Sequence, residues 1–513
     1  MKLIKILSDK IQIKTDCFEF SDAKINDLIK ISDGKVELLT AVTSLSDTDI
    51  STPDDEYIEI PESIKTIECS IIGSIKNGKF IKAIDQYPEM NIQASKISKE
   101  EFSSIIECTE SGFDIGFYTE YECPAYIDGN KFFQRHSCIV GNTGSGKSET
   151  VAKILEESSK LPGTNIIVFD IHGEYRNLSY SDNIKIGEDF PFPIWMFGFS
   201  EMVSNIFNIK EESSNVYMAA MRKAYKSICK NANEGKPIYF DINDFLYLLV
   251  SYNEQTVGTG EFYKSGDKAG LEKTTKGDFN GKLSTLIQIL KSKMGDKRYS
   301  FLFSDVDQWF LNKFVSRIMG SEKPVKNIDL SDIPHDIAIP IIGSVTKLVY
   351  ELKKEIGDKI NPITIVCDEA HVYIPNNFQL SASERRMVEV FENIAKEGRK
   401  FGVTLFVASQ RPSELNKTIM AQCANFIVSK LNNENDKSMI KGMLPDGNES
   451  IIGSTTMFSP GDVLVIGDAS PIPIKIHVSL AKERPESRTI DFWSSWKEKK
   501  TTDFSEDIDD FLK

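Results

Sequence analysis

The sequence lacks the patterns that mark membrane-spanning and secreted proteins. No apolar run approaches the ~18 residues that a transmembrane helix requires. The opening segment Met1–Lys10 is interrupted by charged side chains and has no apolar core of the kind found in signal peptides. The eight cysteines are scattered without a C-x-x-C pair, so neither a zinc site nor a disulfide framework is indicated. These absences predict a cytoplasmic protein with reduced thiols and no membrane partner.

An excess of positive charge is also missing. The 61 Lys and Arg residues are outnumbered by 76 Asp and Glu, and the net charge is −15. At long range such a molecule repels a phosphate backbone, so any contact with nucleic acid has to be local. With 513 residues, 40% of them hydrophobic and 27% charged, the composition is that of a globular protein of about three domains.

Short strand-like runs characterise the N-terminal region. They are Lys2–Leu7, Lys35–Thr43 and Ile64–Ile72, and polar clusters such as Ser44–Asp55 separate them. This spacing is typical of a small all-β barrel or sandwich. We therefore expect an N-terminal β-barrel over residues 1–115.

From about residue 116 the pattern changes to alternating strands and helices. The strand Ser137–Val140 is followed by a Gly-rich turn, the helical pattern Glu149–Ser159 and a second strand, Asn165–Asp170. This order predicts a parallel sheet covered by helices. We assign residues 116–195 to the first part of an α/β, RecA-like P-loop core.

The same pattern returns after residue 334. Apolar strands are predicted at Ile363–Cys367 and Val403–Ala408, with the helix Ala382–Arg399 between them. Two closing strands are expected at Asp462–Ile466 and Ile472–Val478. Residues 335–480 therefore form the second part of the core.

Between the two parts, helical segments dominate, so we predict a helical insertion over residues 196–334. Helices are expected at Glu211–Ala232, Lys282–Met294 and Phe301–Met319. The stretch Ser251–Gly281 is rich in Gly, Lys, Thr and Asp and predicts a long mobile loop. Residues 481–513 form a C-terminal tail whose end, Thr501–Lys513, carries five acids and is either a solvated terminus or a docking strip.

An uninterrupted phosphate-binding motif lies between the first core strand and its helix. Its glycines let backbone N–H groups turn toward phosphate oxygens, and the helix N-terminus adds positive charge. Lys147 is expected to reach the β and γ phosphates, and Ser148 to bind Mg²⁺. The expected ATP-binding residues are Gly141, Asn142, Thr143, Gly144, Ser145, Gly146, Lys147, Ser148 and Glu149.

Two adjacent carboxylates follow the strand Ile363–Cys367. Asp368 is expected beside the Mg²⁺ ion, and Glu369 is expected to act as general base for the water that attacks the γ-phosphate. A tandem Asp-Glu after an apolar strand favours ATP hydrolysis over nucleotide binding alone.

Other polar residues end neighbouring strands. Asp170 and Glu174 should lie on the same rim, where Asp170 serves either the site or only the turn. Gln410 follows another strand, from which it would hydrogen-bond the γ-phosphate and sense its loss.

Two arginines precede strands. Arg399 lies at a helix end before Val403, and Arg135 lies just before Ser137. Such arginines either satisfy helix carbonyls or reach a γ-phosphate, in the case of Arg399 across a subunit boundary.

These motifs together resemble the HerA family of DNA translocases, a group related to the FtsK pumps. The matching blocks lie between Arg135 and about Leu480, outside the insertion. They are Arg135–Gly141, Phe169–Tyr175, Asp368–His371, Lys396–Val403 and Ser409–Pro412.

The resemblance implies a ring of six subunits, a homo-hexamer that pumps double-stranded DNA through a central channel with ATP bound at the subunit interfaces. It also implies an N-terminal β-barrel and a C-terminal segment that braces the neighbouring subunit. By motif match, hydrolysis is assigned to Lys147, Ser148, Asp368 and Glu369 with ATP and Mg²⁺. Gln410 is then the sensor, and Arg399 and Arg135 complete the catalytic site.

Rings of this family work with effectors, either a NurA-type nuclease or, in antiviral defence operons, a sirtuin-like NAD-consuming enzyme. No effector domain is recognisable in this chain, so the expected partner is a separate protein. An alternative is an assembly scaffold in which ATP switches the effector with little movement of DNA. A superfamily 2 RNA helicase is disfavoured because Asp368 lies too far from Lys147 and too little chain remains for a second RecA-like domain.

Overall fold

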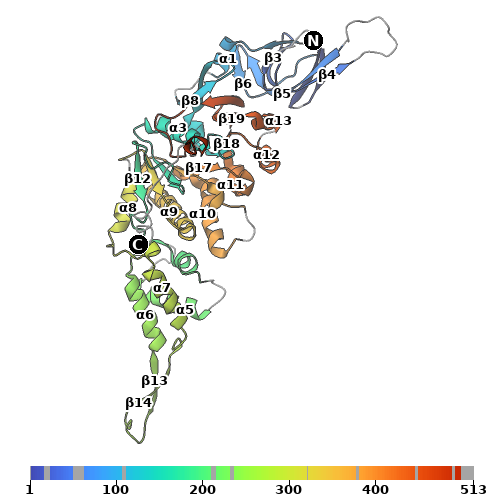
Figure 1. Cartoon of the computed structure of the whole chain (residues 1–513). Coiled ribbons are helices and arrows are strands. Elements are labelled where there is room, and N and C mark those ends of the chain that lie inside the picture. Colours follow the sequence, from blue (N-terminus) through green and yellow to red (C-terminus); the bar gives the residue numbers. More distant parts are fainter. Residues whose placement is uncertain are drawn as a thin grey trace.

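The computed structural model covers most of the chain (Figure 1). It describes all residues except 1, 8, 17–22, 50–62, 107–110, 210–214, 231–235, 321, 377–379, 445–448, 488–491 and 498–513. The predicted acidic end of the tail, Thr501–Lys513, lies outside the described residues. No helix in the described part is both long and apolar enough to cross a bilayer.

An 11-stranded sheet forms the centre of the molecule. Its strand order is β12-β15-β11-β16-β17-β10-β18-β19-β20-β8-β9, and the pairs from β12 to β18 are parallel while the others are antiparallel. Strands β10, β11, β15, β16 and β17 are buried at every position, and burial on both faces explains the apolar runs of β11, β16 and β17. The bounds are β8 Gly112–Tyr118, β9 Cys123–Asp128, β10 His136–Val140, β11 Ile166–Asp170, β12 Ser181–Lys185, β15 Val325–Asp329, β16 Ile363–Cys367, β17 Val403–Ser409, β18 Cys423–Val428, β19 Asp462–Gly467 and β20 Ile474–Val478.

Helices cover both faces of the parallel part. Helix α3 (Lys147–Ser159) packs with Val168, Val366 and Phe406 on one face. Helices α9 (His335–Ile356) and α10 (Ala382–Glu397) pack on the other, with residues such as Ile365 and Leu405. Because alternate residues of a strand point to opposite faces, each buried strand contributes to both cores. The shorter helices near this sheet are α2 Gly129–Gln134, α11 Lys417–Gln422, α12 Glu434–Lys441, α13 Glu449–Gly453 and α14 Phe492–Ser495.

The structure confirms the core strands and the phosphate-loop helix that the sequence predicts. It also contains core elements that were not predicted. The strand β15 joins the parallel sheet between β11 and β12 although it lies within the residues assigned to the insertion. It was missed because three of its five residues, Lys326, Asn327 and Asp329, are polar, so it lacks a continuous apolar run.

The N-terminal strands form a separate antiparallel sheet with α1 (Lys99–Ile105) beside it. The order is β1-β2-β5-β4-β3-β7, with β6 paired to β5. The predicted closed barrel is not confirmed, because the described edge strands β1 and β7 do not pair with each other. Instead the Leu3 N–H donates to the carbonyl of Met90, which lies in an irregular segment before β7. The bounds are β1 Lys2–Ile6, β2 Lys10–Asp16, β3 Leu28–Ser32, β4 Glu37–Asp49, β5 Ser63–Lys76, β6 Lys79–Ile81 and β7 Gln93–Lys96.

Helices project from the core at the end opposite to the N-terminal sheet (Figure 1). The predicted long loop over Ser251–Gly281 is wrong, because β13 and β14 form an antiparallel hairpin there. Threonines and a bulge at its glycines permit this pairing without any buried apolar face, which is why the hydrophobic pattern gave no signal. The bounds are α4 Phe199–Glu201, α5 Asn215–Ile228, α6 Ile242–Glu254, β13 Thr256–Phe262, β14 Glu272–Lys276, α7 Ser284–Gly295 and α8 Phe310–Met319, with a π-helical turn at Met202–Ile206.

Candidate active site at the carboxyl edge of the parallel strands

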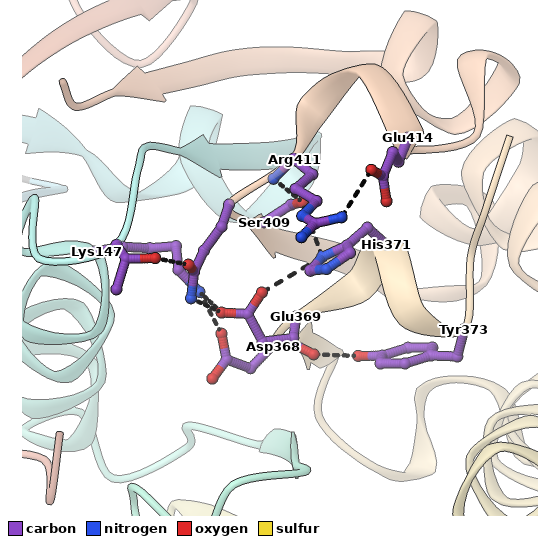
Figure 2. A network of polar contacts seen from close by, with 10 residues as sticks. Lys147, Asp368, Glu369, His371, Tyr373, Ser409, Arg411 and Glu414 are labelled. Carbon is purple, nitrogen blue, oxygen red and sulfur yellow. Dashed lines mark hydrogen bonds and ion pairs between the residues drawn. The ribbon is translucent and has the colours of Figure 1, made fainter. Parts of the chain in front are cut away.

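The parallel strands bring most of the candidate residues to one edge of the sheet. The phosphate loop follows β10, Asp368 and Glu369 follow β16, and Gln410 follows β17. Since β10, β16 and β17 are neighbours and parallel, their carboxyl ends meet. Figure 2 shows Lys147 pointing toward Asp368 and Glu369 from the opposite side of this edge.

The loop before α3 has the backbone geometry of an anion cradle. Gly144 and Gly146 have φ angles of 74° and 94°, which side-chain-bearing residues rarely adopt. A Cβ atom on Gly141 would lie 2.6 Å from the Cβ of Ser429, so this position has no room for a side chain. Helix α3 begins at Lys147 without a side-chain cap. Its first N–H groups are therefore free of intrahelical partners and favour a bound phosphate.

Lys147 is held by both acids of the tandem pair. Its Nζ atom lies 2.9 Å from Asp368 Oδ1 and 2.7 Å from Glu369 Oε1, and all three side chains are buried. Burial alone would lower the pKa of Lys147, but the two carboxylates outweigh it and raise the pKa. The ammonium group is thus charged and positioned to transfer from these carboxylates to a phosphate.

Glu369 is fixed by a strained backbone and by several polar neighbours. Its φ angle of 46° places a non-glycine residue in the left-handed region, a conformation often kept at functional sites. Gln410 Nε2 donates to Glu369 Oε1 at 2.6 Å, and His371 Nδ1 lies 3.3 Å from Oε2. Burial favours a raised pKa for Glu369, but Lys147 lowers it overall, so the group is an anionic acceptor of protons or hydrogen bonds.

Gln410 lies where strand β17 meets the phosphate loop. Its side-chain oxygen accepts a hydrogen bond from the Thr143 hydroxyl while its nitrogen donates to Glu369. One amide therefore contacts both the loop that cradles phosphate and the carboxylate beside it. This arrangement can transmit the presence of a phosphate group to Glu369.

The oxygen groups at this edge fit a divalent cation. Asp368 is 2% exposed at the end of β16, and Ser148 is the second residue of α3. Glu174 has a buried Oε2 atom with no hydrogen-bond partner among the described residues. Burial raises the pKa of Glu174, and the nearby Ser148 hydroxyl acts in the opposite direction. Hydroxyl and carboxylate oxygens are the ligands that Mg²⁺ prefers, so Ser148 and Asp368 would hold it, with Glu174 close by.

Asp170 organises the turn after β11. It is fully buried, and its carboxylate accepts hydrogen bonds from the N–H groups of Glu174 and Tyr175 at 3.0 and 2.9 Å and from Asn327 Nδ2 at 3.1 Å. Burial raises its pKa to about 6 despite these bonds. Asp170 thus fixes the backbone that carries Glu174.

The structure does not bring Arg135 and Arg399 to this edge. Each precedes a strand whose other end meets the phosphate loop or Gln410, and a five-residue strand such as β10 is about 16 Å long. The two arginines instead line one groove of about 1110 Å³ at the amino edge of the sheet. Arg135 pairs there with Asp468 at 2.9 Å, and both side chains are about half exposed.

Several contributors to the site carry no sequence signal of their own. The Tyr373 hydroxyl donates to the Asp368 carbonyl at 3.0 Å. Arg484, close to the C-terminus, binds Glu149 in the first turn of α3 with both Nε and a terminal nitrogen, at 2.8 and 2.6 Å. Residues so far apart in sequence are joined only by the fold.

Comparison with known proteins agrees with this geometry. The family model described as "Helicase HerA, central domain" matches residues 113–349. A probable helicase of Methanocaldococcus jannaschii is 25% identical over 502 residues, covering 92% of this chain and 90% of the relative. A probable DNA double-strand break repair helicase HerA of the same organism is 27% identical over 436 residues, covering 79% and 83%. VirB4 of Thermoanaerobacter pseudethanolicus shares the fold, with a TM-score of 0.50, 15% identity and coverage of 73% of this chain and 98% of its own.

Proposed function

From the match of residues 113–349 to the HerA central domain, we propose that this chain is a HerA-type P-loop ATPase that hydrolyses ATP to move along or unwind double-stranded DNA. The observation that carries the proposal is the buried group of Lys147, Asp368 and Glu369, joined by Gln410, beside the phosphate loop. A protein that only binds nucleotide does not need a strained, anionic glutamate at the position of the γ-phosphate.

In the proposed reaction, the loop N–H groups and Lys147 bind the phosphates of ATP. Lys147 leaves Asp368 and Glu369 as it does so, which frees both carboxylates. Asp368 and Ser148 would hold Mg²⁺, which would supply positive charge to the phosphates. Glu369 orients the attacking water and accepts its proton, while Gln410 keeps Glu369 aligned and contacts the γ-phosphate.

We further propose that Arg135 and Arg399 act on the ATP of a neighbouring subunit. Within one chain they lie at the amino edge of the sheet, away from the phosphate loop. A head-to-tail contact would bring this edge of one subunit against the carboxyl edge of the next, and repetition of such a contact closes a ring. A homo-hexamer is the assembly that we expect, with one shared site at each interface.

The DNA and effector partners follow from the family proposal. Relatives are named as DNA double-strand break repair helicases, which supports duplex DNA as the substrate. With a net charge of −15, contact requires a few basic residues repeated around a channel rather than a basic surface. We propose a separate nuclease or sirtuin-like NADase as effector, in antiviral defence or DNA end processing.

The test is steady-state ATP hydrolysis with and without linear duplex DNA, with particle mass measured in the same buffer. We expect hydrolysis to rise several-fold with DNA in a hexamer-sized particle. Lys147→Ala serves as the blank, and Lys236→Ala, an exposed lysine paired with Glu355, is the matched control that should retain activity. Hydrolysis indifferent to DNA would contradict the motor and favour an ATP-switched scaffold.

A further inference from the structure

A buried histidine lies at the amino edge of the sheet, next to Arg135 in the sequence and within electrostatic reach of Arg399. His136 is the first residue of β10, follows Arg135 directly and is 2% exposed. Its Nδ1 atom accepts a hydrogen bond from the backbone N–H of Leu405 at 3.0 Å. Backbone pairing between β10 and β17 begins at Ser137 and Phe406. One residue earlier, the His136 ring, rather than a backbone group of β10, accepts the hydrogen bond from Leu405.

The Leu405 N–H belongs to the strand that positions Arg399. Arg399 lies in the 3₁₀ turn Gly398–Phe401, which connects α10 to β17 through Gly402. This connection is tightly packed, since a Cβ on Gly398 would lie 2.5 Å from the Val403 carbonyl oxygen, and Gly402 has a φ of 69°. A short and rigid turn transmits any shift at the start of β17 to Arg399.

The protonation state of His136 suits this contact. Burial lowers its pKa to about 4, and the positive charge of Arg399 contributes in the same direction. The imidazole is therefore neutral near pH 7, and with Nδ1 as acceptor it carries its proton on Nε2. The backbone carbonyl of Ala395, in the last turn of α10, faces the imidazole and acts to raise the pKa, but burial outweighs it.

We propose that His136 is a positioning residue that sets Arg399 relative to Arg135, so that both arginines meet one γ-phosphate of the neighbouring subunit. Its backbone continues from Arg135, and its ring holds the strand that follows Arg399. Both arginines line the same groove, although 264 positions separate them in the sequence. The proposal rests on the proposed role of these arginines across the subunit interface.

Two substitutions distinguish this role from simple filling of space. His136→Leu fills the apolar volume but cannot accept the Leu405 N–H, whereas His136→Asn is smaller but places an oxygen acceptor near the Nδ1 position. We expect His136→Leu to lower kcat for ATP about tenfold, because a misplacement on the order of 1 Å is enough for such a loss. His136→Asn should remain within about threefold of the unchanged protein, and binding of a fluorescent ATP analogue should be unchanged in both.

A double-mutant cycle with Arg399→Ala tests whether His136 acts through that arginine. In the Arg399→Ala background, His136→Leu should cause no further loss of kcat, and His335→Ala, at an exposed histidine, is the matched control. Multiplicative losses, or a better result for Leu than for Asn, would overturn the positioning role. If Arg399→Ala alone leaves kcat unchanged, the arginine role in the proposed function fails instead. Unfolding temperatures of all variants identify any loss of folding.

Discussion

The two edges of the parallel sheet differ in how their charged residues are held. At the carboxyl edge, Lys147, Asp368 and Glu369 are buried and satisfy one another. At the amino edge, Arg135 and Arg399 border an open groove. The same strands connect the two edges, but the charged side chains form a buried, mutually paired group at the carboxyl edge and line an open groove at the amino edge. The difference fits the proposal that each chain provides most of one catalytic site and two arginines of another.

The energies of the ion pairs at the two edges agree with this division. The Arg135–Asp468 pair is about half exposed on both sides and contributes on the order of 1 kcal/mol or less. Arg135 can therefore leave Asp468 for a phosphate with little loss. A buried ammonium such as that of Lys147 is strongly destabilised if it loses its partners without a replacement, so it requires the phosphate as its new partner.

The largest expected effect on ATP hydrolysis comes from a substitution at the carboxyl edge. Glu369→Gln keeps the shape of the side chain but removes its ability to accept a proton. We expect ATP hydrolysis to fall at least about 100-fold while binding of a fluorescent ATP analogue persists. The control is Glu397→Gln, at an exposed glutamate that ends α10 near the amino edge. Near-normal turnover by Glu369→Gln would refute its assignment as the base.

Mixing two inactive variants tests whether the amino edge of one subunit completes the ATP site of its neighbour. Arg399→Ala retains the phosphate loop, and Lys147→Ala retains the arginine, so each should be nearly inactive alone. In an equimolar mixture of exchanging subunits, about a quarter of the interfaces would pair an intact loop with an intact arginine. Activity should therefore reappear on mixing. If it stays at the level of the separate variants while mixed rings form, Arg399 does not act across the interface.

The residues at the carboxyl edge of the sheet were far easier to predict from the sequence than those at the amino edge. Apolar strands followed by Gly141–Ser148 and by Asp368–Glu369 predict that these residues meet, because neighbouring parallel strands end at a common edge. Arg135 and Arg399 were found only as arginines before strands. Their shared groove depends on strands β10 and β17 being neighbours, which no local pattern reveals.

Other features escaped prediction for similar physical reasons. The contact of His136 with Leu405 joins residues 269 positions apart and replaces a backbone partner that the sequence does not mark. Closure of the N-terminal barrel depends on the pairing of β1 with β7, and alternating strands predict a sheet without specifying whether its edges meet. The β13–β14 hairpin has exposed strands, so the hydrophobic pattern on which strand prediction depends was absent.

The smallest expected effect concerns the burial of Asp170 at the carboxyl edge. Its pKa rises to about 6 in the folded protein, above its ordinary value of 3.8, so the folded state binds more protons between these values. The contribution of Asp170 to the unfolding free energy is therefore greatest below about pH 4 and falls by about 3 kcal/mol as pH rises through 6. We expect the stability of the unchanged protein relative to Asp170→Asn to decrease over this range in urea unfolding.

The sign of this pH dependence decides whether burial or hydrogen bonding dominates the pKa of Asp170 at the carboxyl edge. Asp33, a fully exposed residue whose pKa backbone N–H groups lower to about 2, provides a control, since Asp33→Asn should produce no trend between pH 4 and 7. If the stability of the unchanged protein relative to Asp170→Asn instead increases with pH, the hydrogen bonds from Glu174, Tyr175 and Asn327 outweigh burial. The carboxyl edge would then favour negative charge more strongly than its burial suggests, and Asp170 would stabilise the ionised turn that presents Glu174.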